Sequence, residues 1–220
     1  MPFLATRLDR IKPSPTIAVT TRAAELKAQG RDVIGLGAGE PDFDTPEHIK
    51  EAARVALAKG YTKYAPVEGI APLREAIAAK LKRENGLTYS SEQITVGCGG
   101  KQTIYNALMA SLNPGDEVIV PAPYWVSYPD ITLLAEGTPV FVETSVEDGF
   151  KMSPAKLEAA ITQRTKWLIL NSPSNPTGAI DHEADLEDLA ARLDRKGVAF
   201  LSDEIYAGFA YDRPIPSLGK

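Results

Sequence analysis

Four short segments of the sequence carry the side chains that could do chemistry, and each directly follows a predicted strand. The first contains Gly99, Gly100 and Lys101, and a helix that begins there would offer free backbone N–H groups to an anion such as a phosphate. The second contains Tyr124 and Trp125, whose rings could stack on a planar heterocycle. Glycines also serve tight turns and aromatic residues also fill cores, so both segments have a purely structural alternative.

The other two segments present polar side chains. Residues 171–178 read Asn-Ser-Pro-Ser-Asn-Pro-Thr-Gly, where the prolines and the glycine fix a turn that leaves the amide of Asn175 free to face a cleft. Asp203 follows the apolar residues 198–201, and Tyr206 lies three residues further on. A carboxylate at the end of a buried strand is costly without a cation, and the pyridinium nitrogen of pyridoxal phosphate is one such partner. An ordinary Asn-Pro turn and a helix-capping aspartate are the structural alternatives.

Two common nucleotide-binding motifs do not account for the glycines. A Walker A loop is excluded because Thr95 stands where its first glycine belongs and Gln102 replaces its Ser or Thr. Residues 35–39 have part of the spacing of a dinucleotide fingerprint, but Pro41 follows them and no helix is predicted to begin there.

The elements that must position these segments alternate along the chain. Short β-branched runs predict strands, and the amphipathic runs between them predict helices. Strands separated by helices of this length form a largely parallel sheet, at whose carboxyl edge ligands bind. The predicted strands are residues 94–96, 117–120, 140–143, 167–170 and 198–201, with a further apolar strand before the glycines of 35–39. The predicted helices are residues 20–29, 46–59, 71–85, 102–112, 124–135, 154–161 and 183–196.

Two of these helices carry clear end signals. Ser153 ahead of Pro154 predicts an N-cap, and Gly197 predicts the end of the helix over residues 183–196.

Composition limits the class of protein. The 220 residues are 44% hydrophobic and 24% charged, which is an ordinary globular mixture and excludes a disordered chain. With 24 basic and 29 acidic residues the net charge is −5, and the basic residues are scattered, so we expect no nucleic-acid partner. One cysteine and two histidines argue against a disulfide and a metal site. There is no apolar run of membrane-helix length and no signal-peptide core, so we expect a cytoplasmic protein with no membrane partner.

Together and in this order, the segments resemble the class I aminotransferases of pyridoxal-phosphate fold type I, nearest to the bacterial aspartate aminotransferase branch. The resemblance runs from about Leu8 to the end of the chain and rests on residues 38–44, 63–66, 99–102, 123–128, 171–178 and 202–206. It implies a three-layer α/β fold around a mostly parallel sheet, incomplete in this chain. Residues 1–45 would form an N-terminal arm and small-domain segment, and residues 46–220 the large domain that binds pyridoxal 5'-phosphate.

The resemblance also implies how the cofactor would be held. Backbone N–H groups of Gly99, Gly100 and Lys101 would bind its phosphate, and Trp125 would lie against its ring. Tyr64 would reach the phosphate held by a neighbouring subunit, so a homodimer is implied.

Three further side chains would act on the polar atoms of the ring. Asn175 and Tyr206 would both donate to the phenolic oxygen. Asp203 would keep the ring nitrogen protonated, which makes the ring an electron sink for charge at the substrate's α-carbon.

The substrate would meet several of the same residues. The backbone at Gly39 would contact its carboxylate, and Trp125 and Asn175 would line its site. Lys101 is a candidate cation for a side-chain carboxylate, and Lys12 is a second candidate, with a solvated surface lysine as its structural alternative.

Residues 1–220 do not contain the family's catalytic lysine. In the family, the lysine that forms the Schiff base lies downstream of the Asp-Glu-Ile-Tyr motif, in a Ser-Lys context ahead of Gly-Trp-Arg. Neither motif follows Asp203 here, and Lys220 is too close to Asp203 and lacks that context. No catalytic residue is therefore assigned, and we expect this chain to be the N-terminal half of an aminotransferase and inactive alone.

For the complete polypeptide we expect an enzyme of amino-acid biosynthesis. It would move an amino group between an acidic L-amino acid, aspartate first, and 2-oxoglutarate. Prephenate, or aromatic or neutral amino acids, are alternative substrates. A non-catalytic remnant that binds the cofactor or a partner is the alternative from a different class of function.

Overall fold

The computed structural model describes residues 3–212, 215–217 and 219. The chain divides into two compact units, one of Lys12–Val67 and one of Met1–Ile11 together with Glu68–Lys220. The predicted boundary at residue 45, between an arm and a large domain, concerns the complete fold and stays a prediction.

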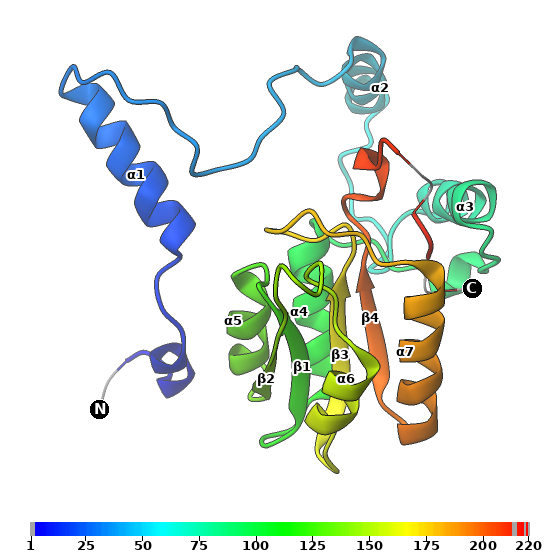
Figure 1. The fold of residues 1–220 in the computed structure, drawn as a ribbon. Coiled ribbons are helices and arrows are strands. Elements are labelled where there is room, and N and C mark those ends of the chain that lie inside the picture. The colour runs from blue at the N-terminus through cyan, green and yellow to red at the C-terminus, as the bar shows by residue number, and fades with distance from the viewer. Residues whose placement is uncertain (1–2, 213–214, 218, 220) are drawn as a thin grey trace. The chain divides into compact units, whose positions relative to one another are not determined.

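The larger unit is built on a sheet whose neighbouring strands are all parallel (Figure 1). Its order is β2-β1-β3-β4, with β1 at Glu117–Ala122, β2 at Thr138–Glu143, β3 at Thr165–Asn171 and β4 at Ala199–Asp203. The prediction of an α/β fold with a parallel sheet is confirmed, and these strands lie close to their predicted positions.

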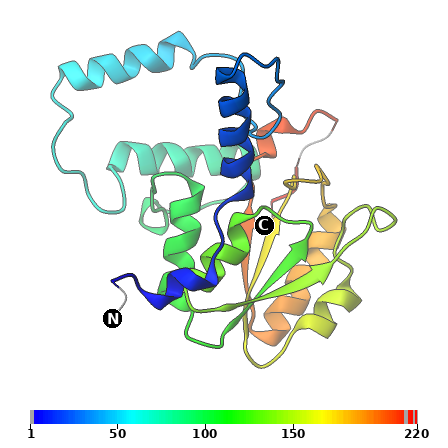
Figure 2. The ribbon, with the colours of Figure 1, turned by 90° about the vertical axis from the view of Figure 1, so that its left-hand side faces the viewer.

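Helices cover both faces of this sheet, which gives three layers (Figure 1 and Figure 2). One face carries α4 (Gly100–Ser111) and α5 (Ser127–Leu134), and the other carries α6 (Pro154–Ala160) and α7 (Glu183–Lys196). Val118 belongs to the core under α4 and α5, whereas Ile119 belongs to the core under α6 and α7. β1 therefore fills both cores, because successive side chains of a strand point to opposite faces.

The predicted N-cap of α6 and the predicted C-terminal glycine of α7 are both confirmed. The hydroxyl of Ser153 accepts a hydrogen bond from the backbone N–H of Lys156 at 3.3 Å and caps α6. Gly197 ends α7 in the left-handed region, with φ +66°. Leu189 and Leu193 of α7 are buried against the sheet.

The helix predicted over residues 71–85 is formed in two parts. The first is α3 (Ala71–Lys80), and the second is a single π-helical turn, η2 (Leu81–Asn85), which ends at Gly86. Three short 3-10 turns complete the larger unit: η1 (Thr6–Arg10), η3 (Ser91–Gln93) and η4 (Ala207–Phe209).

Two predictions for the larger unit are wrong. Residues 94–96 do not form a strand, because the N–H of Val96 donates to the carbonyl of Glu68 at 2.9 Å while Gly69 packs against the Val96 side chain. The helix predicted from residue 124 begins only at Ser127. The sheet strand before it extends to residue 122 and a proline follows, so the chain needs the next residues to turn.

The smaller unit contains α1 (Pro15–Ala28) and α2 (Glu47–Ala58). α1 starts earlier than its predicted first residue 20, because the Ser14 hydroxyl accepts from the N–H of Ile17 and caps it there. The apolar strand predicted before the glycines of 35–39 does not form.

Candidate active site

A pocket of about 510 Å³ opens at the carboxyl edge of the sheet in the larger unit. Its volume lies in the range of small-molecule sites. Apart from Tyr64, it brings together every residue to which the sequence assigned cofactor binding. The lining consists of Gly99, Gly100, Lys101, Ile104, Trp125, Tyr128, Asn171, Asn175, Asp203, Ile205 and Tyr206.

The glycine segment forms the start of α4. Gly99 is its N-cap with φ +86°, a left-handed conformation that favours glycine, and no side chain caps this helix end. A Cβ atom added at Gly99 or Gly100 would meet nothing within 4 Å, so the backbone is open on that side. The first N–H groups of α4 are therefore accessible to an anion, and Lys101 adds a positive charge.

Asp203 ends β4 and is held from two directions. The hydroxyl of Tyr128 donates to Oδ2 of Asp203 at 2.7 Å, and the backbone N–H of Ile205 donates to Oδ1 at 3.2 Å. Tyr128 is buried, and its burial followed by the charge of Asp203 raises the pKa of its hydroxyl. Tyr128 therefore stays a donor to the carboxylate.

Asn171, the last residue of β3, joins the two loops that carry Asn175 and Asp203. Its Nδ2 donates to the backbone carbonyl of Asp203 at 2.9 Å, and its Oδ1 accepts from the backbone N–H of Asn175 at 2.7 Å. Sequence reasoning did not assign a role to Asn171 or to Tyr128. The available signal was position: Asn171 directly follows an apolar run, and Tyr128 lies three residues after Trp125.

Asn175 and Tyr206 meet across the pocket. Nδ2 of Asn175 lies 3.4 Å from the Tyr206 hydroxyl and donates to it. The turn behind Asn175 is closed by the N–H of Gly178, which donates to the carbonyl of Ser174 at 2.8 Å. The arrangement offers an amide and a phenol to a single acceptor atom of a ligand.

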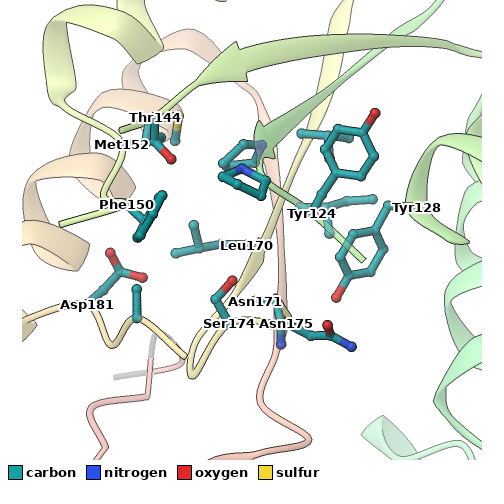
Figure 3. Close-up of a pocket in the computed structure, with 15 residues that line it drawn as sticks. Tyr124, Tyr128, Thr144, Phe150, Met152, Leu170, Asn171, Ser174, Asn175 and Asp181 are labelled. Carbon is teal, nitrogen blue, oxygen red and sulfur yellow. The ribbon is translucent and has the colours of Figure 1, made fainter. Parts of the chain in front are cut away.

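Of the neighbouring aromatic residues Tyr124 and Trp125, only Trp125 lines the pocket. Nζ of Lys101 lies 4.9 Å from the centroid of the Trp125 ring, within the distance of a cation–π contact. Tyr124 instead stacks on Phe141 with ring centroids 4.9 Å apart. Figure 3 shows the hydroxyls of Tyr124 and Tyr128 pointing in opposite directions, with that of Tyr128 on the side of Asn171 and Asn175.

A small cavity of about 30 Å³ lies next to the larger pocket, and Tyr128, Asn171 and Asn175 line both (Figure 3). Asp181 lines it, and burial raises the pKa of this carboxyl. The backbone N–H of Asp181 donates to the hydroxyl of Ser172 at 3.0 Å, which ties the start of the 171–178 turn to the residues that follow it.

Gly39, Tyr64 and Lys12 belong to the smaller unit, where all three are exposed. Their roles toward substrate and cofactor stay predictions.

Within the described ranges 3–212, 215–217 and 219, no three His, Cys, Asp or Glu residues gather as a metal site requires. Within the same residues, no helix is long and apolar enough to cross a membrane.

The chain matches a family model described as aminotransferase class I and II over residues 31–218. It belongs to this family. The aspartate/prephenate aminotransferase of Cereibacter sphaeroides is 61% identical over 213 residues, which are 96% of this chain and 53% of that protein. The one from Nitrosomonas europaea is 54% identical and covers 92% of this chain and 51% of its own length.

Among solved structures, the aspartate aminotransferase of Thermus thermophilus with maleate superposes with a TM-score of 0.97 at 52% identity. The match covers 100% of this chain and 57% of that one. The chain thus spans about half the length of the curated relatives it matches. The resemblance to class I aminotransferases inferred from the sequence is confirmed.

The family implies dependence on pyridoxal phosphate, and the donor set of the pocket fits that molecule. An open helix N-terminus suits its phosphate, and Trp125 offers a face for its ring. Asn175 and Tyr206 suit its phenolic oxygen, and the carboxylate of Asp203 suits a protonated ring nitrogen.

Proposed function

We propose that the complete polypeptide carrying this chain is a pyridoxal-phosphate-dependent aminotransferase that moves an amino group between L-aspartate and 2-oxoglutarate. The observation that carries the proposal is the convergence of four separate loops on one pocket, in a chain that belongs to the aminotransferase family. The residues that converge are Gly99, Gly100, Lys101, Trp125, Asn175, Asp203 and Tyr206.

Each of these residues has a task that its place supports. The N-terminus of α4 would bind the phosphate, and Trp125 would cover the ring and exclude water from it. Asn175 and Tyr206 would donate to the phenolic oxygen, and Asp203 would hold a proton on the ring nitrogen. When bound, the cofactor supplies an electron sink for negative charge at the substrate's α-carbon.

Lys101 is the candidate for the side-chain carboxylate of aspartate, because its ammonium group lies in the pocket beside Trp125. The Thermus relative was solved with maleate, a dicarboxylate. Lys12 and the backbone at Gly39 are proposed as further substrate contacts from the smaller unit.

Steady-state rates over a panel of amino donors, with 2-oxoglutarate as acceptor, test this assignment. Lys101→Met should raise the KM for aspartate by at least about tenfold and leave neutral donors nearly unchanged, because one charge pair is lost. Lys82→Met, at an exposed position, is the matched control. A complete polypeptide that does not transfer the amino group of aspartate, or prefers aromatic or neutral donors, contradicts the proposal.

Prephenate is the second candidate substrate. The relatives from Cereibacter and Nitrosomonas are both named aspartate/prephenate aminotransferases. Prephenate is a 2-oxo acid with a second carboxylate, so the same cation could bind it. The test is the rate with prephenate as amino acceptor, compared with 2-oxoglutarate at equal concentration.

We further propose that residues 1–220 alone do not turn over aspartate. The experiment is to mix the purified chain with pyridoxal phosphate, reduce with borohydride and map the adduct. Stoichiometric labelling of one lysine together with turnover would contradict this proposal. The downstream reading frame distinguishes an aminotransferase from a non-catalytic remnant, because a Ser-Lys motif followed by Gly-Trp-Arg would argue against a remnant.

A homodimer is also proposed, with Tyr64 contributing to the phosphate site of the second copy. The Tyr64 side chain is fully exposed. Sedimentation of the complete polypeptide should give a dimer. Tyr64→Phe should weaken cofactor binding and leave the dimer intact. A monomer that binds pyridoxal phosphate with full affinity would contradict both parts.

A further inference from the structure

Glu204, the neighbour of Asp203, is held by side chains from three parts of the larger unit. Its Oε1 accepts from the hydroxyls of Ser202 at 2.9 Å and Ser217 at 2.8 Å, and its Oε2 accepts from Nδ2 of Asn85 at 3.4 Å. Ser202 belongs to β4, Asn85 ends η2, and Ser217 is buried near the C-terminus.

The orientation of the Asn85 amide is fixed from its other side. Nζ of Lys80 donates to Oδ1 of Asn85 at 2.9 Å and also pairs with Glu84 at 3.3 Å. Because an ammonium group only donates, the amide oxygen must face Lys80 and the amide nitrogen must face Glu204. Asn85 reaches this place at the end of a π-helical turn, a feature that is frequent at functional sites.

An ionised carboxylate matches this set of donors because both of its oxygens accept. Glutamine has the same shape but a single oxygen. When that oxygen faces the two serines, its NH2 group faces Nδ2 of Asn85, donor against donor. In the reversed orientation the NH2 group faces the two serine hydroxyls, which must then turn to accept. In either orientation, glutamine removes the charged acceptor that Ser202, Ser217 and Asn85 share.

Glu204 also lies inside the turn that positions the carboxylate of Asp203. The carboxylate of Asp203 accepts from the N–H of Ile205 on one oxygen and from Tyr128 on the other, so the turn from Asp203 to Ile205 encloses Glu204. Tyr128 fixes this turn from the pocket side, and Glu204 fixes it from the opposite side through Asn85 and Ser217.

We propose that Glu204 is a positioning residue, which keeps the turn of Asp203 in the conformation that faces the pocket. Its anchors lie outside the pocket lining, on η2 and in the C-terminal segment. The part of this inference that concerns the cofactor rests on the proposed function of Asp203.

The experiment compares Glu204→Gln, Asn85→Asp and their combination in the complete polypeptide. Hydrogen exchange of residues 202–206 is measured on cofactor-free protein, and the Kd for pyridoxal phosphate is measured separately. Glu204→Gln should speed exchange in this segment and raise the Kd, each roughly tenfold, because a hydrogen bond to a charged group is lost. Asn85→Asp should act in the same direction, because two carboxylates then face each other.

The combined variant reverses the polarity of the pair, since the new amide can donate to the new carboxylate. It should restore exchange and Kd to within about threefold of wild type, as expected for a coupled pair. A role limited to general stability would not produce this rescue. Glu92→Gln, at an exposed position of η3, is the matched control, because it removes one carboxylate from the same unit and should change neither readout.

Wild-type exchange in Glu204→Gln, or no recovery in the combined variant, overturns the proposal. If Glu204→Gln does not fold, Ser217→Ala removes one donor and must still speed exchange in residues 202–206; unchanged exchange would overturn the proposal. If the wild type fails to bind pyridoxal phosphate, the proposed function fails, while exchange in the cofactor-free protein still decides the role of Glu204.

Discussion

The hydroxyl of Tyr128 donates to the carboxylate of Asp203 at 2.7 Å, across 75 positions of sequence. Burial keeps this hydroxyl un-ionised by raising its pKa, so the bond persists over the working range of pH. Asp203 thus has a fixed donor on its pocket side, and each of its carboxylate oxygens keeps a further lone pair for a ligand.

Tyr128→Phe removes this donor and leaves the ring in place. We expect the free energy of unfolding to fall by about 1 kcal/mol and the Kd for pyridoxal phosphate to rise several-fold, because Asp203 loses a hydrogen bond. Chemical denaturation and a cofactor titration of the complete polypeptide measure the two effects. Tyr124→Phe is the control, since the Tyr124 ring stacks on Phe141 and its hydroxyl points the other way. Equal losses in both variants would show that the Tyr128–Asp203 bond has no special role.

Asn171→Asp tests the bridge between the two loops. The new carboxylate can still accept from the N–H of Asn175, but it cannot donate to the carbonyl of Asp203 and would repel it. We expect a loss of roughly 2 kcal/mol in stability. Asn106→Asp, on the exposed face of α4, adds the same charge and should cost less than about 0.5 kcal/mol. Similar denaturation midpoints for the two variants would argue against the bridge.

Two added methyl groups at the start of α4 should have different effects. Gly99→Ala forces a side chain into the left-handed region at φ +86° and should destabilise the protein by about 1 kcal/mol. Gly100→Ala lies within the helix and has open space around it, so cofactor-free protein should be equally or more stable. Thermal unfolding of the cofactor-free variants separates them. A lower Tm for Gly100→Ala than for Gly99→Ala would contradict the described backbone.

Glu117→Gln tests a buried carboxylate at the other end of β1. Its oxygens accept from the Thr162 hydroxyl at 2.6 Å and from Arg164 at 2.7 Å, and these partners, Thr162 first, lower the pKa of Glu117. The substitution should cost roughly 2 kcal/mol at pH 7. Because the folded pKa lies below the unfolded value of about 4.3, this stabilisation is present above that value and is lost as the pH falls through the folded pKa.

Urea unfolding between pH 7 and 3 measures this dependence. The wild type should lose more stability than Glu117→Gln over the acidic part of that range. Glu187→Gln, at an exposed position of α7, should follow the wild type. Parallel curves for wild type and Glu117→Gln would contradict the assignment.

The pocket was largely predictable because its residues follow strands in the sequence. Once the strands were placed, the polarity of a parallel sheet required Trp125, Asn175 and Asp203 to lie at one edge. α7 was predicted with its observed bounds, because its leucine spacing and the glycine after it agree.

What the sequence missed depends on contacts between distant residues. Tyr128 in an amphipathic segment is typical of a core residue, and only the hydroxyl of a folded chain reveals its bond to Asp203. Glu204 and Asn85 are 119 positions apart, and no local pattern connects them. Residues 94–96 have a strand-like composition, but their backbone partner is a loop carbonyl rather than a strand.

The parallel sheet places the contacts that stabilise the strands at one end and the pocket at the other end. β1 and β3 start at Glu117 and Thr165, whose side chains are joined by a hydrogen bond, and both strands end at the pocket edge. Substitutions that alter substrate preference can therefore accumulate at one edge without loosening the other. For the same reason, the exposed side chain of Gln163, in the turn before β3, offers an attachment point for a fluorescent reporter that follows folding at a distance from the pocket.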